Sequence, residues 1–244
     1  MVAVLEEPAA YHLLFEVCWG GNLYQRVSQL DMGEQLPEVE VQDVMRSVCV
    51  AVAACHENNV CHRDIKPENL LYGGPTSSQL KLIDFGLAVD AWVPPVDTDH
   101  DDNDNDETGS DPVDGVQKGT GTGGAVLQSR QPRRLRGRAG SALYLAPEVL
   151  NDDYDLQCDA WSIGVVGYYT LTGQPPFTGP TLNDVFDSIR TGSYSLDLVK
   201  EKGRTPEAAD FIGRLLVVDP AKRMTVDEAL QHPWLKDVPD LLAA

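Results

Sequence analysis

Apolar residues recur along this chain mostly at the spacing of helices. Between residues 37 and 58 they fall on one face of a helix, at Val39, Val41, Val44, Val48 and Val52. The stretch QCDAWSIGVVGYYTLTG, residues 157–173, is apolar on almost every side, which is typical of a helix at the centre of a core. These two segments predict the central helices of the fold.

Shorter segments add helices and a few strands. YHLLFEVCWGG, residues 11–21, predicts a buried strand that ends at a glycine pair, and NLYQRVSQL after it predicts a short helix. QLKLIDFG, from Gln79, predicts a second short strand. Three later segments, TLNDVFDSIRTG, TPEAADFIGRLLVV and TVDEALQHPWL, predict two or three more helices, and Thr205 and Thr225 stand at capping spacing before Glu or Asp. We therefore predict a mainly α fold of the α+β class, without internal repeats.

A polar insertion interrupts this pattern at about residues 90–137. It is rich in Asp, Gly, Thr and Pro and has little periodicity, which predicts a disordered loop. Nine acidic residues lie between Asp97 and Asp114, where there is no Lys or Arg, and they account for nearly half of the net charge of −19. We interpret this run as a solvated, self-repelling segment. A role in mimicking phosphorylation or blocking substrate, by attracting Arg63 or the arginines of residues 130–138, stays open.

Two motif matches inside the insertion fail on context. GTGTGG, residues 119–124, satisfies the GxGxxG pattern, but it neither follows a predicted strand nor opens a helix. A calcium loop that starts at Asp104 places Gly109 correctly but puts Gly115 where Glu is required. A calcium-binding module is therefore nearly excluded.

Composition limits the classes of function. The chain has 244 residues, of which 42% are hydrophobic, so it can bury a substantial core, while its acidity argues against general nucleic-acid binding. Five scattered cysteines without a CxxC pair do not predict a disulfide framework or a structural zinc site. No leader or bilayer-length apolar segment is evident, so we expect no secretion and no membrane insertion, and a location in the cytoplasm or nucleus.

Five short motifs stand in a fixed order: HRDIKPENLL from His62, LIDFG from Leu82, YLAPE from Tyr144, CDAWSIG from Cys158, and DPAKR with ALQHPWL from Asp219. With these motifs the chain resembles the eukaryotic protein kinases from about Leu14 to Leu235, apart from the insertion. The resemblance implies a helical C-terminal kinase lobe over residues 19–244. It also implies a hinge and a remnant of the N-terminal β lobe over residues 1–18.

Phosphoryl transfer explains the polar residues of the first two motifs. The attacking hydroxyl must be held in line with the γ-phosphate of ATP, and Asp64 is suited to accept its proton. Lys66 would offset negative charge on the moving phosphoryl group. Asn69 and Asp84 supply the oxygen ligands that Mg²⁺ prefers. HRD by itself would indicate only a turn with a capping Asp. The combination of Asp64 with Lys66, Asn69 and Asp84 favours a catalytic role.

The resemblance also implies the substrates and partners. Glu16 and Cys18 match the hinge that hydrogen-bonds adenine, and Leu71 matches the floor of the adenine pocket. The form HRDIKPEN is similar to that of Ser/Thr kinases, so a protein Ser or Thr is the expected acceptor. The later motifs most resemble the calcium/calmodulin-dependent and calcium-dependent group. ATP, Mg²⁺, a protein substrate and a regulatory or activating protein are the expected partners, with neither nucleic acid nor membrane among them.

Further residues are implied to support the site rather than react. His62 would support the backbone, Arg63 would steady the activation segment, and Ser141 stands where such kinases generally have a Thr that contacts the catalytic Asp. The remaining residues are Glu148, which would form a buried ion pair with Arg223, and Asp159, which would hold the backbone of the catalytic loop.

The segment before Leu14 offers no glycine-rich phosphate loop, no ATP-positioning Lys and no Glu partner for it. Removing a positioning cation costs several kcal/mol of transition-state stabilisation. We therefore expect this polypeptide by itself to be weakly active or inactive, with a truncated reading frame as the explanation. The alternative is a non-catalytic, pseudokinase-like scaffold that keeps the lobe for docking, although a scaffold would not need Asp64, Lys66, Asn69 and Asp84 together.

Overall fold

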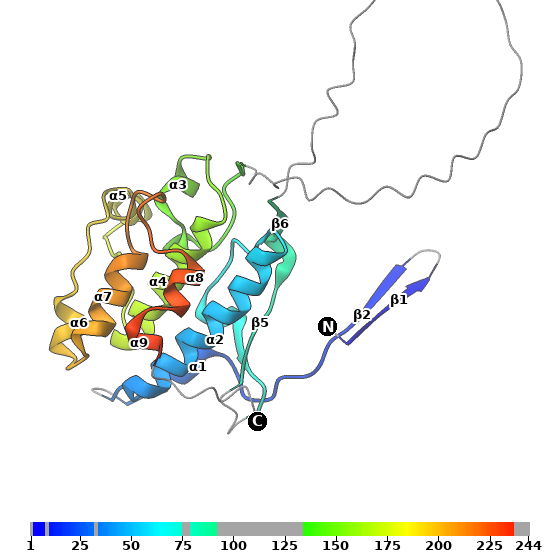
Figure 1. Ribbon diagram of the computed structural model, residues 1–244, viewed down its shortest axis with the longest axis horizontal. Coiled ribbons are helices and arrows are strands. Elements are labelled where there is room, and N and C mark those ends of the chain that lie inside the picture. Colours follow the sequence, from blue (N-terminus) through cyan, green and yellow to red (C-terminus); the bar gives the residue numbers. More distant parts are fainter. Residues whose placement is uncertain (1, 8–9, 32–33, 75–78, 92–133, 237–244) are drawn as a thin grey trace, which may run out of the picture.

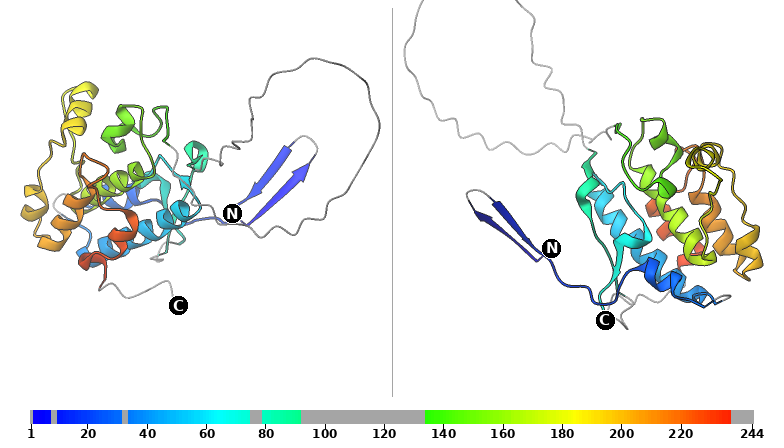
Figure 2. Two further views of the ribbon diagram at one scale, coloured as in Figure 1. Left: turned by 45° about the horizontal axis from the view of Figure 1, so that its top comes forward. Right: turned by 180° about the vertical axis from the view of Figure 1, so that it is seen from behind.

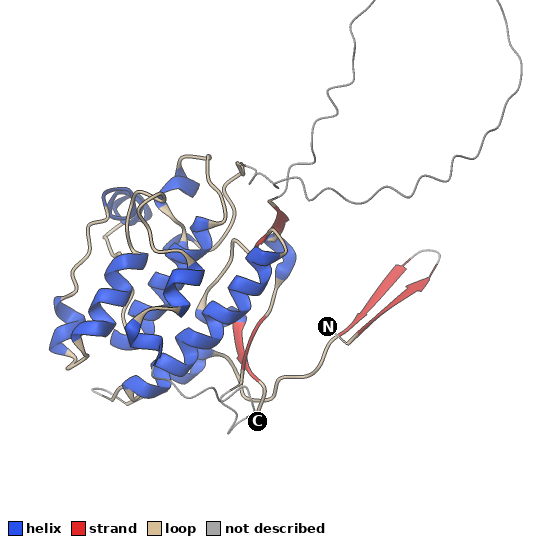
Figure 3. Cartoon of the chain, in the orientation of Figure 1, coloured by secondary structure: helices blue, strands red, loops and turns tan. Residues whose placement is uncertain are grey.

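Two long helices form the centre of the molecule, which is described here from a computed structural model. α2 (Glu38–Glu57) and α4 (Gln157–Thr172) pack against each other inside a helical body. Figures 1 and 3 show the other helices arranged around this pair. The structure describes residues 2–7, 10–31, 34–74, 79–91 and 134–236. The prediction of a mainly α fold is confirmed.

The helical pattern of α2 and α4 is confirmed with one exception. α2 buries Val41, Val44, Val48 and Val52, and α4 is buried along nearly its whole length. Val39 is 57% exposed. Because it lies two residues from Val41, it projects from the opposite side of the helix.

The remaining helices are shorter. They are α1 (Leu23–Ser28), α3 (Pro147–Leu150), α5 (Leu182–Thr191), α6 (Asp197–Glu201), α7 (Pro206–Leu215), α8 (Val226–Leu230) and α9 (Pro233–Lys236). Of these, α1, α5, α7 and α8 begin after an Asn or Thr whose side chain caps the first turn. The side chains of Thr205 and Thr225 accept backbone hydrogen bonds at the starts of α7 and α8, as predicted. The segment predicted as one last helix divides into α8 and α9, because Pro233 lacks the N–H that a continuing helix needs.

Two small antiparallel pairs support the loops between α2 and the insertion. β3 (Val60–Cys61) pairs with β6 (Val89–Asp90), and β4 (Leu70–Tyr72) pairs with β5 (Leu80–Leu82). Short 3₁₀ turns follow at Pro67–Asn69, Phe85–Leu87 and Ala142–Tyr144. The pairing brings the segment around Asp64 and the segment around Asp84 to the same region of the body.

The first hairpin differs from the prediction. β1 (Ala3–Glu7) and β2 (Ala10–Leu14) pair antiparallel, but every residue of β2 is exposed. The hairpin stands apart from the helical body in each view of Figures 1 and 2. The prediction of a buried strand is therefore wrong. An apolar sequence shows that a strand is suited to burial, but it does not show whether another part of the fold packs against that strand.

Most of the predicted disordered loop, residues 92–133, lies outside the described residues. At its far end, the described residues 134–137 have defined contacts, unlike the prediction. Leu135 and Tyr154 exchange backbone hydrogen bonds of 2.6 and 3.2 Å, and both side chains are buried. Among the described helices, none has both the length and the apolar character needed to span a bilayer.

Candidate active site

Asp159, at the start of α4, fixes the backbone of the loop that carries Asp64 through hydrogen bonds. The Asp159 carboxylate accepts hydrogen bonds from the backbone N–H groups of His62 and Arg63, both at 2.9 Å. His56 Nε2 lies 2.9 Å from the same carboxylate. Burial alone would raise the pKa of Asp159, but the bonds from His56 and the two amides outweigh it and lower the pKa. A fully buried anion thus fixes the loop backbone.

Asp64 is the centre of a compact polar cluster. Lys66 Nζ lies 2.6 Å from Oδ2, and the backbone N–H and the hydroxyl of Ser141 donate to Oδ1 at 3.0 and 2.8 Å. Lys66 Nζ also donates to Ser141 Oγ at 2.9 Å. Asn69 Nδ2 donates to the backbone oxygen and to Oδ2 of Asp64, at 2.8 and 3.2 Å. Residues from both sides of the insertion therefore fix one carboxylate.

This cluster determines the protonation of Asp64. Partial burial disfavours the anion, but the hydrogen bonds from Lys66 and Ser141 favour it more strongly, so the pKa of Asp64 is lowered. The group is an anion at neutral pH. It can accept a hydrogen bond from an incoming hydroxyl, which would compete with Lys66 or Ser141 for the carboxylate oxygens.

The two predicted metal ligands lie on neighbouring segments. The backbone N–H of Ile83 donates to the backbone oxygen of Asn69 at 3.0 Å, so Asp84 follows directly after the residue bonded to Asn69. Asp84 is exposed and has a left-handed backbone, with φ of 64°. Its carboxylate accepts from Gly86 N at 3.2 Å. Because the side-chain nitrogen of Asn69 donates to Asp64, the side-chain oxygen is the atom left for a cation. An amide oxygen and a carboxylate are a donor pair that suits Mg²⁺, and that Asn69 and Asp84 hold this ion stays a prediction.

The predicted nucleotide-binding residues lie together along β4. Trp19 N and Gly20 N donate to the oxygens of Gly73 and Tyr72, which places the hinge segment beside the strand that holds Leu71. Glu16 forms an ion pair with Lys81, which lowers the pKa of Glu16. Within the described residues, no backbone hydrogen bond involves Cys18. That Glu16, Cys18 and Leu71 bind adenine stays a prediction.

Arg63 links the segment after Asp84 to the segment before Ser141. Its Nε donates to the Leu87 oxygen at 2.6 Å, and its Nη1 donates to the Tyr154 hydroxyl at 2.9 Å. Tyr154 in turn donates to the Gly137 oxygen at 2.8 Å. Arg63 itself has a left-handed backbone, with φ of 67°. His62 is buried, and its Nε2 lies 3.1 Å from the Ile83 oxygen.

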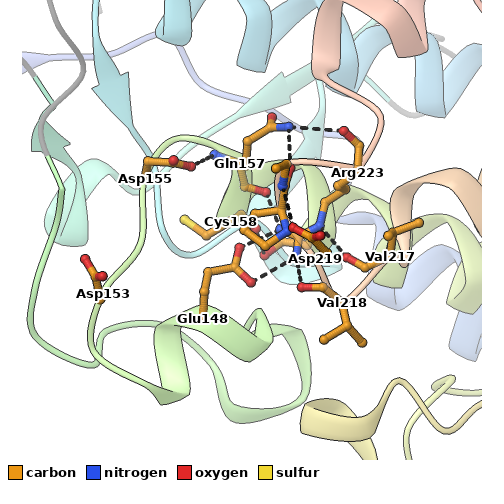
Figure 4. Close-up of polar contacts among 12 residues, drawn as sticks. Glu148, Asp153, Asp155, Gln157, Cys158, Val217, Val218, Asp219 and Arg223 are labelled. Atoms are coloured by element: carbon orange, nitrogen blue, oxygen red, sulfur yellow. Dashed lines mark hydrogen bonds and ion pairs between the residues drawn. The ribbon is translucent and has the colours of Figure 1, made fainter.

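The predicted pairing of Glu148 with Arg223 is present deep in the lobe. The two guanidinium nitrogens donate to the two carboxylate oxygens at 2.6 and 2.9 Å (Figure 4). Arg223 also donates to the oxygens of Val217 and Gln157, and its guanidinium carbon lies 5.1 Å from the centre of the Trp161 ring. The bidentate pair therefore ties the segment before α8 to α3 and α4.

Sequence reasoning missed three contributors to the site. His56, Lys81 and Tyr154 belong to none of the five motifs. Each contacts a predicted residue: His56 contacts Asp159, Tyr154 contacts Arg63, and Lys81 contacts Glu16. Only the tertiary fold brings them there, since no local pattern marks these positions.

The fold and the site together are those of the helical lobe of a protein kinase. Residues 1–97 and 122–235 match the family model described as protein kinase domain. The chain belongs to the protein kinase family.

Curated relatives agree with this assignment. The chain is 36% identical over 230 residues to CDPK-related kinase 5 of Arabidopsis thaliana, covering 94% of this chain and 32% of that protein. It is 30% identical to calcium-dependent protein kinase 3 of Plasmodium yoelii yoelii, covering 97% and 37% of the two chains. A CDPK-related protein kinase of Daucus carota is 35% identical, covering 97% and 33%. The chain thus spans about a third of the length of these relatives, and the resemblance to the calcium-dependent kinase group is confirmed.

Proposed function

We propose that this lobe catalyses transfer of the γ-phosphoryl group of Mg-ATP to a Ser or Thr hydroxyl of a protein. The observation that supports this most directly is the Asp64 carboxylate, which Lys66, Asn69 and Ser141 hold in one orientation. A fixed, ionised carboxylate beside a cation is what in-line attack by a hydroxyl requires.

Each residue of the site then has a separate task. Asp64 accepts the hydrogen bond of the acceptor hydroxyl and receives its proton late in the reaction, because its lowered pKa makes it a weak base. Lys66 balances charge beside it. Asn69 and Asp84 would hold Mg²⁺, which supplies neutralisation of the phosphate oxygens when bound. Asp159 keeps the loop in place through the amides of His62 and Arg63.

The polypeptide of residues 1–244 has low activity by itself in this proposal. Residues 1–15 contain no Lys or Arg, the side chains that would contact the α- and β-phosphates as permanent cations. An activating protein, and a location in the cytoplasm or nucleus, belong to the same proposal.

A thermal shift experiment with Mg-ATP tests the nucleotide site. Ligand at a hundred times its Kd stabilises a protein by about 2.7 kcal/mol, so the midpoint should rise by several degrees. Asp84→Asn should abolish the magnesium-dependent part of the shift, and Asp64→Asn should keep the shift but remove any phosphotransfer to a Ser/Thr peptide. Asp197→Asn, an exposed substitution on α6, is the control. Equal shifts in the wild type and Asp84→Asn would refute the metal assignment.

A non-catalytic docking role is the second candidate. It is favoured by exposed apolar side chains near the site, among them Phe15, Trp19 and Phe85 at 63, 76 and 48% exposure. The same thermal shift experiment separates the two proposals. A chain that binds a partner protein but shows no shift with Mg-ATP or Mn-ATP supports docking alone.

A further inference from the structure

Two buried thiols lie against each other beneath the catalytic loop. Cys61 ends β3 and directly precedes His62, and Cys158 is the second residue of α4 and directly precedes Asp159. Their sulfur atoms are 3.5 Å apart although the residues are 97 positions apart in sequence. Cys61 is 0% and Cys158 is 4% exposed. The pair is therefore a product of the tertiary fold, placed where Asp159 holds the loop.

The surroundings of the pair favour chemistry between the two sulfurs over a metal ion. The ligand atoms of Cys61, Cys158 and Asp159 all lie within 4.8 Å of one another, which could suit a cation. However, the Asp159 carboxylate already accepts hydrogen bonds from the amides of His62 and Arg63 and contacts His56. A metal would have to take this carboxylate from the loop, whereas a disulfide would leave it in place.

We propose that Cys61 and Cys158 are an oxidisable dithiol that closes to an intramolecular disulfide under peroxide. One sulfur attacks the O–O bond of hydrogen peroxide, which gives a sulfenic acid and releases water. The second sulfur then attacks the sulfenic sulfur, the S–S bond forms, and a second water leaves. Two thiols are oxidised and one peroxide is reduced to two waters. The sulfurs must approach from 3.5 Å to about 2.05 Å.

The two cysteines would react with each other because their sulfur atoms are close together, and not because either thiol is unusually acidic. The hydrogen bond to Cys158 and burial raise the pKa of the Cys61 thiol well above its usual value. For Cys158 the hydrogen bond from Cys61 lowers the pKa, but burial and the nearby Asp159 raise it overall. Both thiols therefore react slowly in the first step. The second step is fast by comparison, because the partner sulfur is already in contact.

Both thiols are buried, so an oxidant reaches them only through a local opening of the fold beside the pocket that lies next to them. A surface pocket of about 380 Å³ is lined by His56, which contacts Asp159, and by Gln157, the chain neighbour of Cys158. Hydrogen peroxide is small enough to use such an opening, whereas a bulky thiol reagent is not. Cys49 is the comparison residue for this pair. It is buried too, and burial raises the pKa of its thiol to about 12, but no hydrogen bond to another thiol is recorded for it among the described residues.

Closure would join the start of the catalytic loop to the start of α4. Because the bond would cross-link residues 97 positions apart, it restricts the unfolded chain and should raise the thermal midpoint. It should also slow hydrogen exchange of the His62 and Arg63 amides, which lie beside the new bond. The disulfide is thus a covalent lock on the geometry of the site.

Peptide mapping of the full chain tests the proposal directly. The reduced protein is exposed to hydrogen peroxide, alkylated under denaturing conditions, and digested without reduction. The expected result is one cross-linked peptide pair containing Cys61 and Cys158, a raised thermal midpoint, and loss of both on adding dithiothreitol. Cys49→Ala should behave like the wild type, whereas Cys61→Ser and Cys158→Ser should give no cross-link and no change in midpoint.

Three results would overturn the inference. The first is full oxidation of Cys18 and Cys55 with no Cys61–Cys158 peptide at any time. The second is a cross-link between other cysteines. The third is the expected peptide with a lowered midpoint, which would refute the lock. The mapping uses the wild-type chain, so it decides the question even if a serine variant does not fold.

Discussion

Asp159 shows how one buried charge can organise a loop that it does not belong to. Its side chain is fully buried, yet it stays ionised because three donors surround it: the amides of His62 and Arg63, and His56. Desolvation disfavours the ionised carboxylate and the hydrogen bonds favour it. The pKa of Asp159 is lowered, so the hydrogen bonds have the larger effect. The orientation of Asp64 therefore depends on a residue far away in sequence.

Replacing Asp159 with Asn should destabilise the fold in a pH-dependent way. An Asn oxygen can accept one of the two amide bonds, and the other N–H, left unpaired, costs about 1–3 kcal/mol. Because the folded pKa of Asp159 is lowered, its stabilisation is present above the unfolded value of about 3.9 and is lost as the pH falls through the folded value. The difference in unfolding free energy between wild type and variant should thus be constant above about pH 5 and shrink below about pH 4. Urea titrations of both proteins from pH 3 to 8 measure this difference in unfolding free energy. A difference independent of pH would contradict the conclusion that Asp159 is ionised in the folded protein.

The pair of Glu148 and Arg223 differs sharply from the ion pairs at the surface. Arg223 is 0% and Glu148 is 8% exposed at the side chain, whereas Arg190 and Asp187 are 40 and 74% exposed. Replacing Glu148 with Gln leaves a buried guanidinium without its counter-charge, so we expect a loss of about 3–5 kcal/mol in unfolding free energy. Replacing Asp187 with Asn should cost less than about 1 kcal/mol. Comparable losses in the two variants, measured in urea at pH 7, would show that burial of the pair does not matter.

At the scale of elements, two glycines in helices have opposite roles. A methyl group on Gly164 in α4 would lie 2.9 Å from Leu215 Cβ, which is fixed to the backbone of α7. On Gly213 in α7 the nearest atom would be Leu196 Cδ1, at an ordinary 3.5 Å. Gly164 therefore permits the close approach of α4 and α7, whereas nothing in the packing requires Gly213.

Alanine at these two positions should change stability in opposite directions. Alanine is favoured over glycine in a helix by up to about 1 kcal/mol, so Gly213→Ala should be stabilising. Gly164→Ala gains the same preference but forces two packed helices apart, which costs about 1–3 kcal/mol and should leave the variant less stable. Thermal unfolding of both variants gives the signs. A stabilised Gly164→Ala would mean that α4 and α7 are not in close contact.

Sequence patterns predicted the helices well where apolar residues recur over several turns. The valines of α2 and the apolar run of α4 each have a single compact solution, and the capping roles of Thr205 and Thr225 follow from a few neighbouring residues. α6 (Asp197–Glu201) was missed because five residues are too short for a periodic signal. The prediction that β2 is buried was wrong because the burial of a strand depends on whether other elements pack against it, which the sequence of the strand does not show.

The site was predictable only as far as its motifs reached. Asp64, Lys66 and Asn69 lie within six residues of one another, so local sequence placed them together before any fold was known. The contacts of Tyr154 with Arg63 and of Cys61 with Cys158 join residues more than 90 positions apart. Such contacts depend on how α4 packs against the loop, and a single sequence has no signal for them.

At the scale of the whole molecule, the chain divides into a packed body and an uncovered hairpin. The hairpin of residues 3–14 has exposed apolar side chains on both strands, including Leu5 and Tyr11 at 54 and 69%. A two-stranded hairpin is marginally stable by itself, and its free edges can pair with other strands. The body, in contrast, is built around the buried surfaces of α2 and α4.

Removing residues 1–14 should therefore improve solution behaviour without weakening the body. The hairpin is exposed on both strands and buries little apolar area against α2 or α4, so the unfolding free energy of residues 15–244 should match that of the full chain to within about 0.5 kcal/mol. Loss of an exposed apolar edge should also shift sedimentation from concentration-dependent association toward monomer. The matched control is Tyr11→Thr with Leu13→Thr, which keeps the hairpin length but removes apolar surface, and it should reduce association in part. Urea unfolding followed by tryptophan fluorescence reports on the body, because residues 1–14 contain no Trp and unfolding exposes the buried Trp161 and Trp234. A loss of more than about 1 kcal/mol on deletion would mean that the hairpin packs on the body in solution, against the arrangement in Figure 2.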